Sequence, residues 1–442
     1  MKIEFCGQSS RDGDNWQANT SRLVNLYREV AAGKTQYTLK AVLGSSDFTQ
    51  VPGVFVRALG VVGDYLFTVC GGRLQQIDST GSAIDRGAMD DGTSATISGN
   101  NGDVTVCVGD KYYLWDGATL TEPAPGVFSA FGSLDYIGGY TVLSEKNGKR
   151  FQWSSQLDAT TLPGLSFSSA DGVDDDILRV AEINGVLYIF KETSHEVWYL
   201  TGGAGANAFE RQAGGVVGIG LKDFGLLAKI STGGAFFVGN DGRAHIIGIG
   251  PVSTPAVETA IEKCRPEYCL TYEDEGHTFC AIIFRDCPAW VFDISMGEWH
   301  ERAQGANLDP WKASVSAKFM GKWFIGRAGG DILKLGRVAS DGGLPLARVA
   351  TSNTLDGDGQ RITINEFEIF ANTGFEAGAV ELRLSKDSGR TWGAPRLRFW
   401  SVGEYSRRII WRALGQSRQW TAELRMTDMA DTPINSTVRI AA

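Results

Sequence analysis

The sequence predicts an all-β protein: a β-propeller of six or seven blades, preceded by an N-terminal arm and followed by a C-terminal β domain. The first observation is a phrase that recurs seven times, in which a glycine is followed at once by a run of apolar and β-branched residues. The mean spacing is 43 residues, and a hairpin repeated at a period in the forties is typical of propeller blades. The phrases begin at Gly63, Gly102, Gly139, Gly185, Gly234, Gly276 and Gly321.

The second observation is a further strand-like run after each phrase, separated from it by a polar break. Each repeat is therefore interpreted as an antiparallel hairpin. A propeller closes only when strands from both ends of the array meet, so counting leaves six and seven blades open. The second runs end at Ile77, Trp115, Trp153, Leu200, Gly248, Ile294 and Leu335.

Residues 1–55 do not fit the repeat and are assigned to the arm. The segment 19–30 predicts a short helix or strand, and an alternating run follows over residues 35–42. The apolar residues expected to pack inward in the first segment are Leu23, Leu26 and Tyr27.

Residues 56–345 hold the seven hairpins and are assigned to the propeller. Helical periodicity is nearly absent, and Pro255–Cys264 is the best short helix because a proline stands near its start. Residues 170–178 and 202–215 are polar or glycine-rich and are predicted to be long loops, where contacts with partners tend to lie.

Residues 346–442 are assigned to the C-terminal β domain, which is expected to pack with the arm. Its arginines mostly alternate with apolar residues, as in strands with one solvated face. The alternative is that this basic face docks an acidic partner surface, such as the propeller of a neighbouring copy. These arginines are Arg396, Arg398, Arg407, Arg408, Arg412, Arg418 and Arg425.

Composition and charge exclude several classes of protein. The 442 residues include 56 glycines and 43% apolar residues, which indicates a folded, turn-rich chain. No apolar stretch is long enough to span a bilayer, and the first residues lack the apolar core of a secretory signal, so folding in a reducing cytoplasm is expected. The net charge of -9 disfavours binding to DNA through its phosphates, but suits an acidic wall past which DNA slides.

The cysteines are interpreted as reduced, buried or idle thiols. Four of them lie between residues 264 and 287 with His277 among them, but their spacing matches no common zinc ribbon or finger. No metal and no cofactor is therefore predicted. The seven cysteines are Cys6, Cys70, Cys107, Cys264, Cys269, Cys280 and Cys287.

The sharpest local motif runs from Ser385 to Trp392 and fits the Asp-box pattern S-x-D-x-G-x-T-W. Its expected role is a hairpin turn, in which the aspartate accepts backbone N–H bonds, the glycine supplies a positive φ and the tryptophan packs beneath. The motif residues are Ser385, Asp387, Gly389, Thr391 and Trp392.

No set of residues compels catalysis, and the protein is predicted not to be an enzyme. A glycoside hydrolase needs two carboxylates that face one sugar, and the acidic triplets 174–176 and 273–275 are more typical of solvated turns. Tryptophans in the second runs are expected to pack between blades, with an aromatic sugar platform as the alternative. These tryptophans are Trp115, Trp153, Trp198 and Trp290.

The layout of arm, propeller and C-terminal β unit resembles the tail nozzle proteins of short-tailed bacteriophages, also called packaged-DNA stabilisation proteins. The arm contains a polar N-x-Y-x-E element at residues 25–29. The C-terminal unit contains the Asp-box turn, then GEY at 403–405 and RRIIW at 407–411.

The resemblance implies a structural virion protein that forms a homohexamer below the portal-adaptor ring, closes the DNA channel after packaging and conducts DNA on ejection. Implied partners are this ring, tail spikes or fibres, a needle or plug protein, and double-stranded DNA that passes without sequence-specific binding. The implied place is a virion tail assembled in the host cytoplasm, with no insertion into a membrane. Possible assembly contacts are Asn25, Tyr27, Glu29, Tyr405, Arg407, Arg408 and Trp411.

Two alternatives stay open from the sequence. The first is a carbohydrate-binding or glycan-hydrolysing propeller, which the Asp box and the tryptophans support. The second is a generic propeller scaffold in a bacterial cell.

Overall fold

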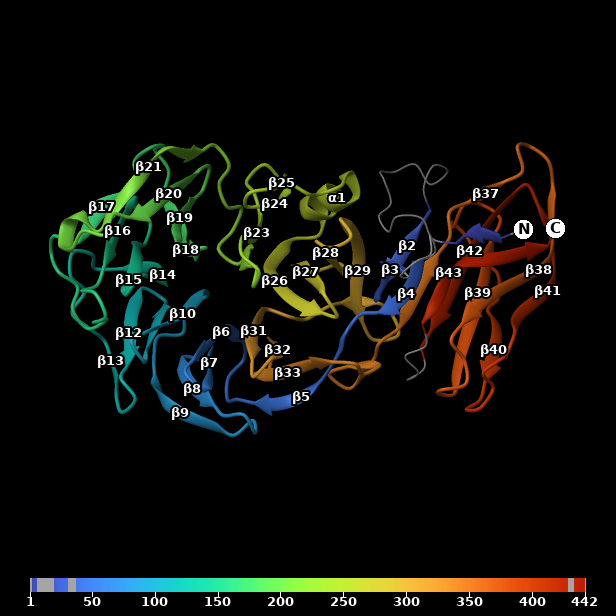
Figure 1. Cartoon of the computed structure of the whole chain (residues 1–442), viewed down its shortest axis with the longest axis horizontal. Coiled ribbons are helices and arrows are strands. Elements are labelled where there is room, and N and C mark those ends of the chain that lie inside the picture. Colours follow the sequence, from blue (N-terminus) through green and yellow to red (C-terminus); the bar gives the residue numbers. More distant parts are fainter. Residues whose placement is uncertain (1, 6–19, 31–36, 428–432, 442) are drawn as a thin grey trace.

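The computed structural model describes residues 2–5, 20–30, 37–427 and 433–441, and it confirms the all-β fold. A seven-bladed propeller lies on one side of the molecule and a β-sandwich on the other, with both chain ends at the sandwich (Figure 1). The single α-helix within these ranges, α1 (Pro255–Lys263), follows blade five where the sequence predicted a helix. No helix of the described chain is long and apolar enough to cross a membrane.

Each blade is a four-stranded antiparallel sheet whose first strand lines the axis. Blades one to three consist of β6 (Val56–Val62), β7 (Tyr65–Cys70), β8 (Arg73–Ile77) and β9 (Ala83–Ala88); β10 (Ala95–Asn100), β11 (Asp103–Val108), β12 (Lys111–Trp115) and β13 (Leu120–Thr121); and β14 (Phe131–Ile137), β15 (Tyr140–Glu145), β16 (Arg150–Trp153) and β17 (Phe167–Ser169).

Blades four to six follow the same order. They consist of β18 (Ile177–Ile183), β19 (Val186–Lys191), β20 (His195–Leu200) and β21 (Phe209–Val217); β22 (Leu227–Lys229), β23 (Ala235–Val238), β24 (Ala244–Ile246) and β25 (Gly250–Pro251); and β26 (Pro266–Asp274), β27 (His277–Phe284), β28 (Ala289–Asp293) and β29 (Glu298–Gln304), extended by β30 (Asp309–Pro310). Half of the predicted loop 202–215 is therefore strand β21.

Blade seven closes the ring with a strand from the arm. Its strands are β31 (Val315–Phe319), β32 (Lys322–Gly326), β33 (Asp331–Gly336) and β5 (Gly44–Gln50), and β5 runs antiparallel to β33. Short strands β34 (Ser340–Asp341) and β35 (Leu344–Pro345) continue this sheet. The inner strand β31 then packs beside β6 of blade one, which settles the blade number at seven.

The glycines of the repeat make the tight turns between the first and second strands of the blades. In five of the seven, the two turn residues both have positive φ, as in Asn101 (51°) and Gly102 (95°). Such turns match the right-handed twist of the paired strands, and glycine adopts the second position without steric cost. The repeated glycine in the sequence therefore marks a repeated tight turn in the structure.

The sandwich is built from both ends of the chain. One sheet has the order β3 (Leu26–Val30), β4 (Tyr37–Ala41), β43 (Ile434–Ala441), β38 (Ile362–Ala371) and β41 (Ile409–Ser417), with β1 (Lys2–Glu4) on β43. The other has the order β2 (Arg22–Val24), β36 (Arg348–Thr351), β42 (Gln419–Met426), β39 (Gly378–Ser385) and β40 (Arg396–Trp400), with β37 (Leu355–Asp356) on β42.

The second sandwich sheet is continuous with blade six. Strand β2 pairs with β36 on one side and, through the parallel pair Val24 and Glu301, with β29 on the other. The result is an 11-stranded sheet that runs from the propeller axis to the far edge of the sandwich. The segment 19–30, for which helix and strand stayed open, is strand in its described part, broken at Asn25.

Candidate functional site

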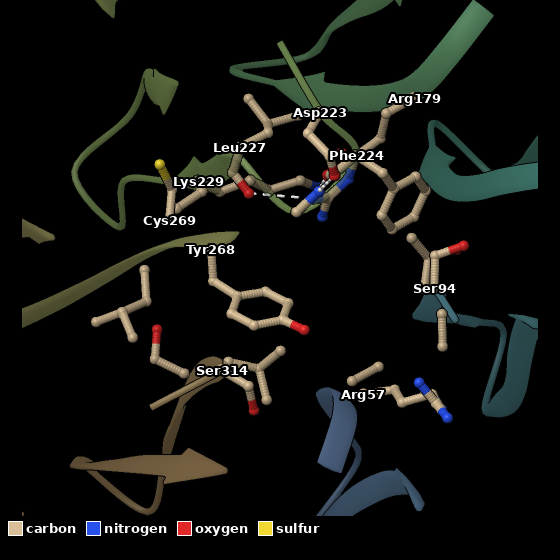
Figure 2. A pocket seen from close by; sticks show the side chains of 18 of the residues that line it. Arg57, Ser94, Arg179, Asp223, Phe224, Leu227, Lys229, Tyr268, Cys269 and Ser314 are labelled. Carbon is tan, nitrogen blue, oxygen red and sulfur yellow. Dashed lines mark hydrogen bonds between the residues drawn. The ribbon is translucent and has the colours of Figure 1, made fainter. Parts of the chain in front are cut away.

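The propeller axis holds a channel of about 1310 Å³, lined by residues from the first strands of all seven blades. Figure 2 shows Tyr268 and the guanidinium of Arg179 projecting into it. Nη1 of Arg179 donates to the backbone oxygens of Phe224 and Leu227 at 3.2 and 3.1 Å. Burial lowers the pKa of Arg179, and these carbonyl oxygens stabilise its charge.

Two acidic residues of the channel, Asp135 and Glu267, are bound to basic side chains. Asp135 is bound to Lys229 at 2.5 Å, and Glu267 is bound to Arg285. A glycosidase requires two carboxylates at a set separation, one of them free to donate a proton. Asp135 and Glu267 are held in ion pairs instead.

The acidic triplets 174–176 and 273–275 also form ion pairs within the chain. Asp174 is exposed and paired with Lys149, while Asp175 lies buried at 2.6 Å from the buried Lys191. Glu273 pairs with Lys318 at 2.6 Å. These contacts fasten the segment before blade four and the edge of the channel, and no described group of His, Cys, Asp and Glu has the arrangement of a metal site.

Asn25 lies at the centre of the junction between arm, blade six and sandwich. Its side chain is fully buried; Nδ2 donates to the backbone oxygens of Ala303 and Ala347 at 2.9 and 2.7 Å, and Oδ1 accepts from the N–H of Ala303 at 3.0 Å. With φ of 56°, Asn25 also makes the break between β2 and β3. Asparagine tolerates this left-handed conformation better than most residues.

Tyr27 continues the junction on the propeller side. It is buried, its hydroxyl lies 3.5 Å from Asp274, and burial raises its pKa to about 12. Arg337 pairs with Asp274 at 2.5 Å, and Lys40 pairs with Glu275 at 2.7 Å. The turn of blade six that carries the second acidic triplet is therefore bound to the arm.

A buried ion pair missed by the sequence reasoning locks blade six to the closing strand. Arg302 and Asp341 are both buried and lie 3.8 Å apart. The guanidinium of Arg302 stacks on Trp311 at 3.8 Å from the ring centre, and Ser45 of β5 donates to Asp341. No periodicity marks these residues, because they come from four separate segments of the chain.

The possible assembly contacts divide by exposure. Asn25, Tyr27 and Trp411 are buried within the chain, so their side chains offer no surface to another subunit. Glu29 is half-buried and paired with Lys40. The other three are exposed: Tyr405, Arg407 and Arg408. A role of the accessible residues in assembly stays a prediction.

The Asp-box residues form a tight turn between β39 and β40. Ser385 donates to Asp387 at 2.7 Å, and Asp387 accepts the backbone N–H of Thr391 at 2.8 Å. These bonds lower the pKa of Asp387 to about 2. Gly389 has φ of 82° and Trp392 is half-buried. The arrangement is structural and leaves no free acid for chemistry.

The prediction that all cysteines are reduced is wrong for one pair. Cys264 and Cys287 form a disulfide, because the end of α1 and the turn after β27 bring their Cα atoms to 5.7 Å. The buried free thiols are Cys70, Cys107, Cys269 and Cys280, while Cys6 lies outside the described residues.

Two family models together span nearly the whole chain. One, described as bacteriophage P22 Gp10, β-propeller, matches residues 6–338, and the other, bacteriophage P22 Gp10, β-sandwich, matches residues 347–440. The chain belongs to the bacteriophage P22 Gp10 family. This confirms the resemblance to phage tail nozzle and stabilisation proteins, and identifies a structural protein of the phage tail.

Other comparisons add less than the Gp10 models. No curated protein sequence matches the chain. Solved structures similar to it include the designed protein Ika8 (11% identity, TM-score 0.42, 65% of this chain and 99% of that one) and YCF48 bound to a D1 peptide (11%, 0.43, 65% and 95%). BBS1N in complex with ARL6DN gives 10% identity and a TM-score of 0.44 over 69% and 98% of the two chains. Similarities at this level support no inference about the function of this chain.

Proposed function

We propose that six copies of this chain form the tail nozzle, a ring below the portal-adaptor ring that closes the DNA channel after packaging and conducts DNA on ejection. The observation that carries the proposal is the Gp10 match over both the propeller and the sandwich. Tail spikes or fibres and a needle or plug protein are the further partners of this proposal, and a virion tail assembled in the host cytoplasm is its place.

The size of the channel within a single chain supports a ring made of several chains. A channel of about 1310 Å³ is comparable to the largest small-molecule pockets, and side chains such as Tyr268 project into it. A DNA duplex therefore needs a wider passage, which several copies around a common axis would enclose. The net charge of -9 suits a wall that DNA passes without adhering.

The joined architecture supports a role as a wall element. The 11-stranded sheet and the buried contacts of Asn25 with Ala303 and Ala347 tie the propeller to the sandwich, so that one chain acts as one rigid piece. In this proposal the arm and the sandwich together form the platform that meets the adaptor. The role is mechanical and non-enzymatic.

Native mass spectrometry combined with negative-stain imaging of the full chain tests the proposal. We expect a closed six-fold ring with an axial hole. A chain that remains a monomer at all concentrations tested would contradict it.

The glycan alternative is left with little support. All four tryptophans of the second runs are buried between or within blades, where they cannot stack on a sugar. Binding of the purified chain to a glycan array tests this alternative. Specific binding to one class of glycan would support it.

A further inference from the structure

The far edge of the sandwich carries a cluster of exposed apolar side chains, which we call the sandwich-edge patch. Each member exposes between 43% and 67% of its surface. Aromatic and branched apolar residues exposed together are uncommon on a monomer and mark interaction sites. The patch consists of Phe375, Leu397, Phe399, Val402 and Tyr405.

Strand β40 forms the spine of the patch. It pairs with β39 on one side, and no described strand pairs with its other side, so it is the last strand of the 11-stranded sheet (Figure 1). Trp400 points into the sandwich core, which turns Leu397 and Phe399 to the opposite, outer face. An edge strand with exposed apolar side chains is a template for association.

The aromatic end of the patch is held in place by two hydrogen bonds between two loops. The N–H of Gly403 donates to the oxygen of Gly374 at 2.8 Å, and the hydroxyl of Thr373 donates to the oxygen of Glu404 at 2.8 Å. Phe375 and Tyr405 then meet edge to face at 5.4 Å.

Gly374 makes this approach of the loops possible. Its φ is 94°, and a Cβ at this position would lie 2.7 Å from the backbone nitrogen of Tyr405. The exposed rings are therefore fixed before any partner binds. Preorganised aromatic side chains lose little entropy on binding and are the usual anchors of protein interfaces.

The charge around the patch points to the kind of partner. Between residues 396 and 412 there are five exposed arginines and one glutamate. Three of these arginines also form ion pairs within the chain: Arg407 with Glu404, Arg408 with Glu368 and Arg412 with Glu366. Residues 346–442 as a whole carry 13 Lys and Arg against 11 Asp and Glu, whereas residues 1–345 carry 29 against 40. The opposite net charge lies in the propeller, since residues 56–345 carry 23 Lys and Arg against 35 Asp and Glu.

We infer that the sandwich-edge patch docks on a second copy of this chain, against its propeller, which has an acidic net charge. The five apolar side chains would form the buried centre of the contact, and exposed arginines such as Arg407, which follows Tyr405 closely in the chain, would form its polar rim. Because the two surfaces differ, the contact is heterologous, and repetition around an axis closes a ring. The inference rests on the proposed nozzle ring and names the surface that builds it.

The test compares the wild-type chain with the double variant Leu397→Asp/Phe399→Asp by native mass spectrometry over a concentration series. Two buried carboxylates at the centre of an interface are expected to weaken assembly about 30-fold or more. The matched control is Val30→Asp in the arm, which is 53% exposed, lies outside both the patch and the propeller, and should assemble like the wild type. Tyr405→Asp is a second, independent variant, and circular dichroism verifies that each variant is folded.

The outcomes separate this inference from the proposed function. A wild-type chain that stays monomeric overturns the ring and the patch together. A wild-type ring that persists in both patch variants overturns the patch alone.

A photo-cross-linker in place of Phe399 identifies the occupant. Cross-links in the wild-type ring are expected within residues 37–345 of a second copy. Cross-links formed in virions only to another tail protein would overturn the assignment to a second copy.

Discussion

The two edges of the sandwich differ in which side chains they bury: the inner edge buries polar ones, and the outer edge exposes apolar ones. At the inner edge, Asn25 and Arg348 lie buried among strands of arm, blade six and sandwich. At the outer edge, Phe399 and Tyr405 are exposed although they stand on ordered backbone. The inner edge is completed within one chain, and the outer edge has the character of a surface completed by another molecule. Substitutions at the two edges should therefore affect different measurements.

The largest effect on stability is expected for Asn25→Ala. The substitution removes three buried hydrogen bonds and places alanine at a φ of 56°. The unpaired oxygens of Ala303 and Ala347 and the strained backbone together should cost about 4 kcal/mol of the free energy of unfolding. Urea unfolding followed by tryptophan fluorescence measures it, with the exposed Asn353→Ala as control. A change of the same size in both variants would show that the junction does not depend on Asn25.

The junction should also weaken as the pH falls, because His300 is held neutral there. Burial, with Arg302 and His277 nearby, lowers its pKa from 6.5 to about 3. Between these values the unfolded chain binds a proton that the folded chain does not, so the stabilisation is complete above pH 6.5 and is lost towards pH 3. At about pH 5.5 the loss should be about 1.4 kcal/mol relative to neutral pH.

The variant His300→Phe separates the contribution of His300 to the pH dependence of stability from that of the other histidines. Phenylalanine fits among Tyr27 and Phe279 but does not titrate, so the variant should lose less stability than the wild type between about pH 7.5 and 5.5. Urea titrations at both pH values measure the difference. Equal losses in the two proteins would mean that His300 is already protonated or solvated in the folded chain.

The propeller could be predicted from the sequence because its signal is local. A turn such as Asn101–Gly102 depends on two adjacent residues, and the same demand recurs in five of the seven blades. The junction could not be predicted, because Asn25 finds its partners about 280 and 320 residues away, near Ala303 and Ala347. Buried polar partners at such separations leave no periodic trace in a chain.

The outer edge shows a second limit of sequence reasoning. The run RLRFW at 396–400 was interpreted as a strand with a solvated arginine face, and the strand exists. However, Arg398 turns towards the other sheet, where its Nε donates to the oxygen of Ile410 at 2.8 Å. Alternation alone gives two faces and does not say which one meets solvent. Here the outer face carries Leu397 and Phe399.

A smaller effect is expected in the turn that leads into this edge. In Asp387→Asn one acceptor oxygen is replaced by an amide, which weakens the bonds from Ser385 and Thr391. Hydrogen exchange at the amide of Thr391 should become faster, while the melting temperature of the chain changes little. Unchanged exchange in the variant would show that the turn is held by its backbone alone.

The smallest effect on the isolated chain is expected for Phe399→Ser. The side chain is 61% exposed, so little apolar contact within the chain is lost, and urea unfolding of the monomer should differ from wild type by less than about 0.5 kcal/mol. If Phe399 instead stabilised the sandwich as Asn25 stabilises the junction, the variant would unfold clearly earlier. An unchanged monomer that assembles poorly would separate the two edges by function: one holds the chain together, and the other joins it to the next copy.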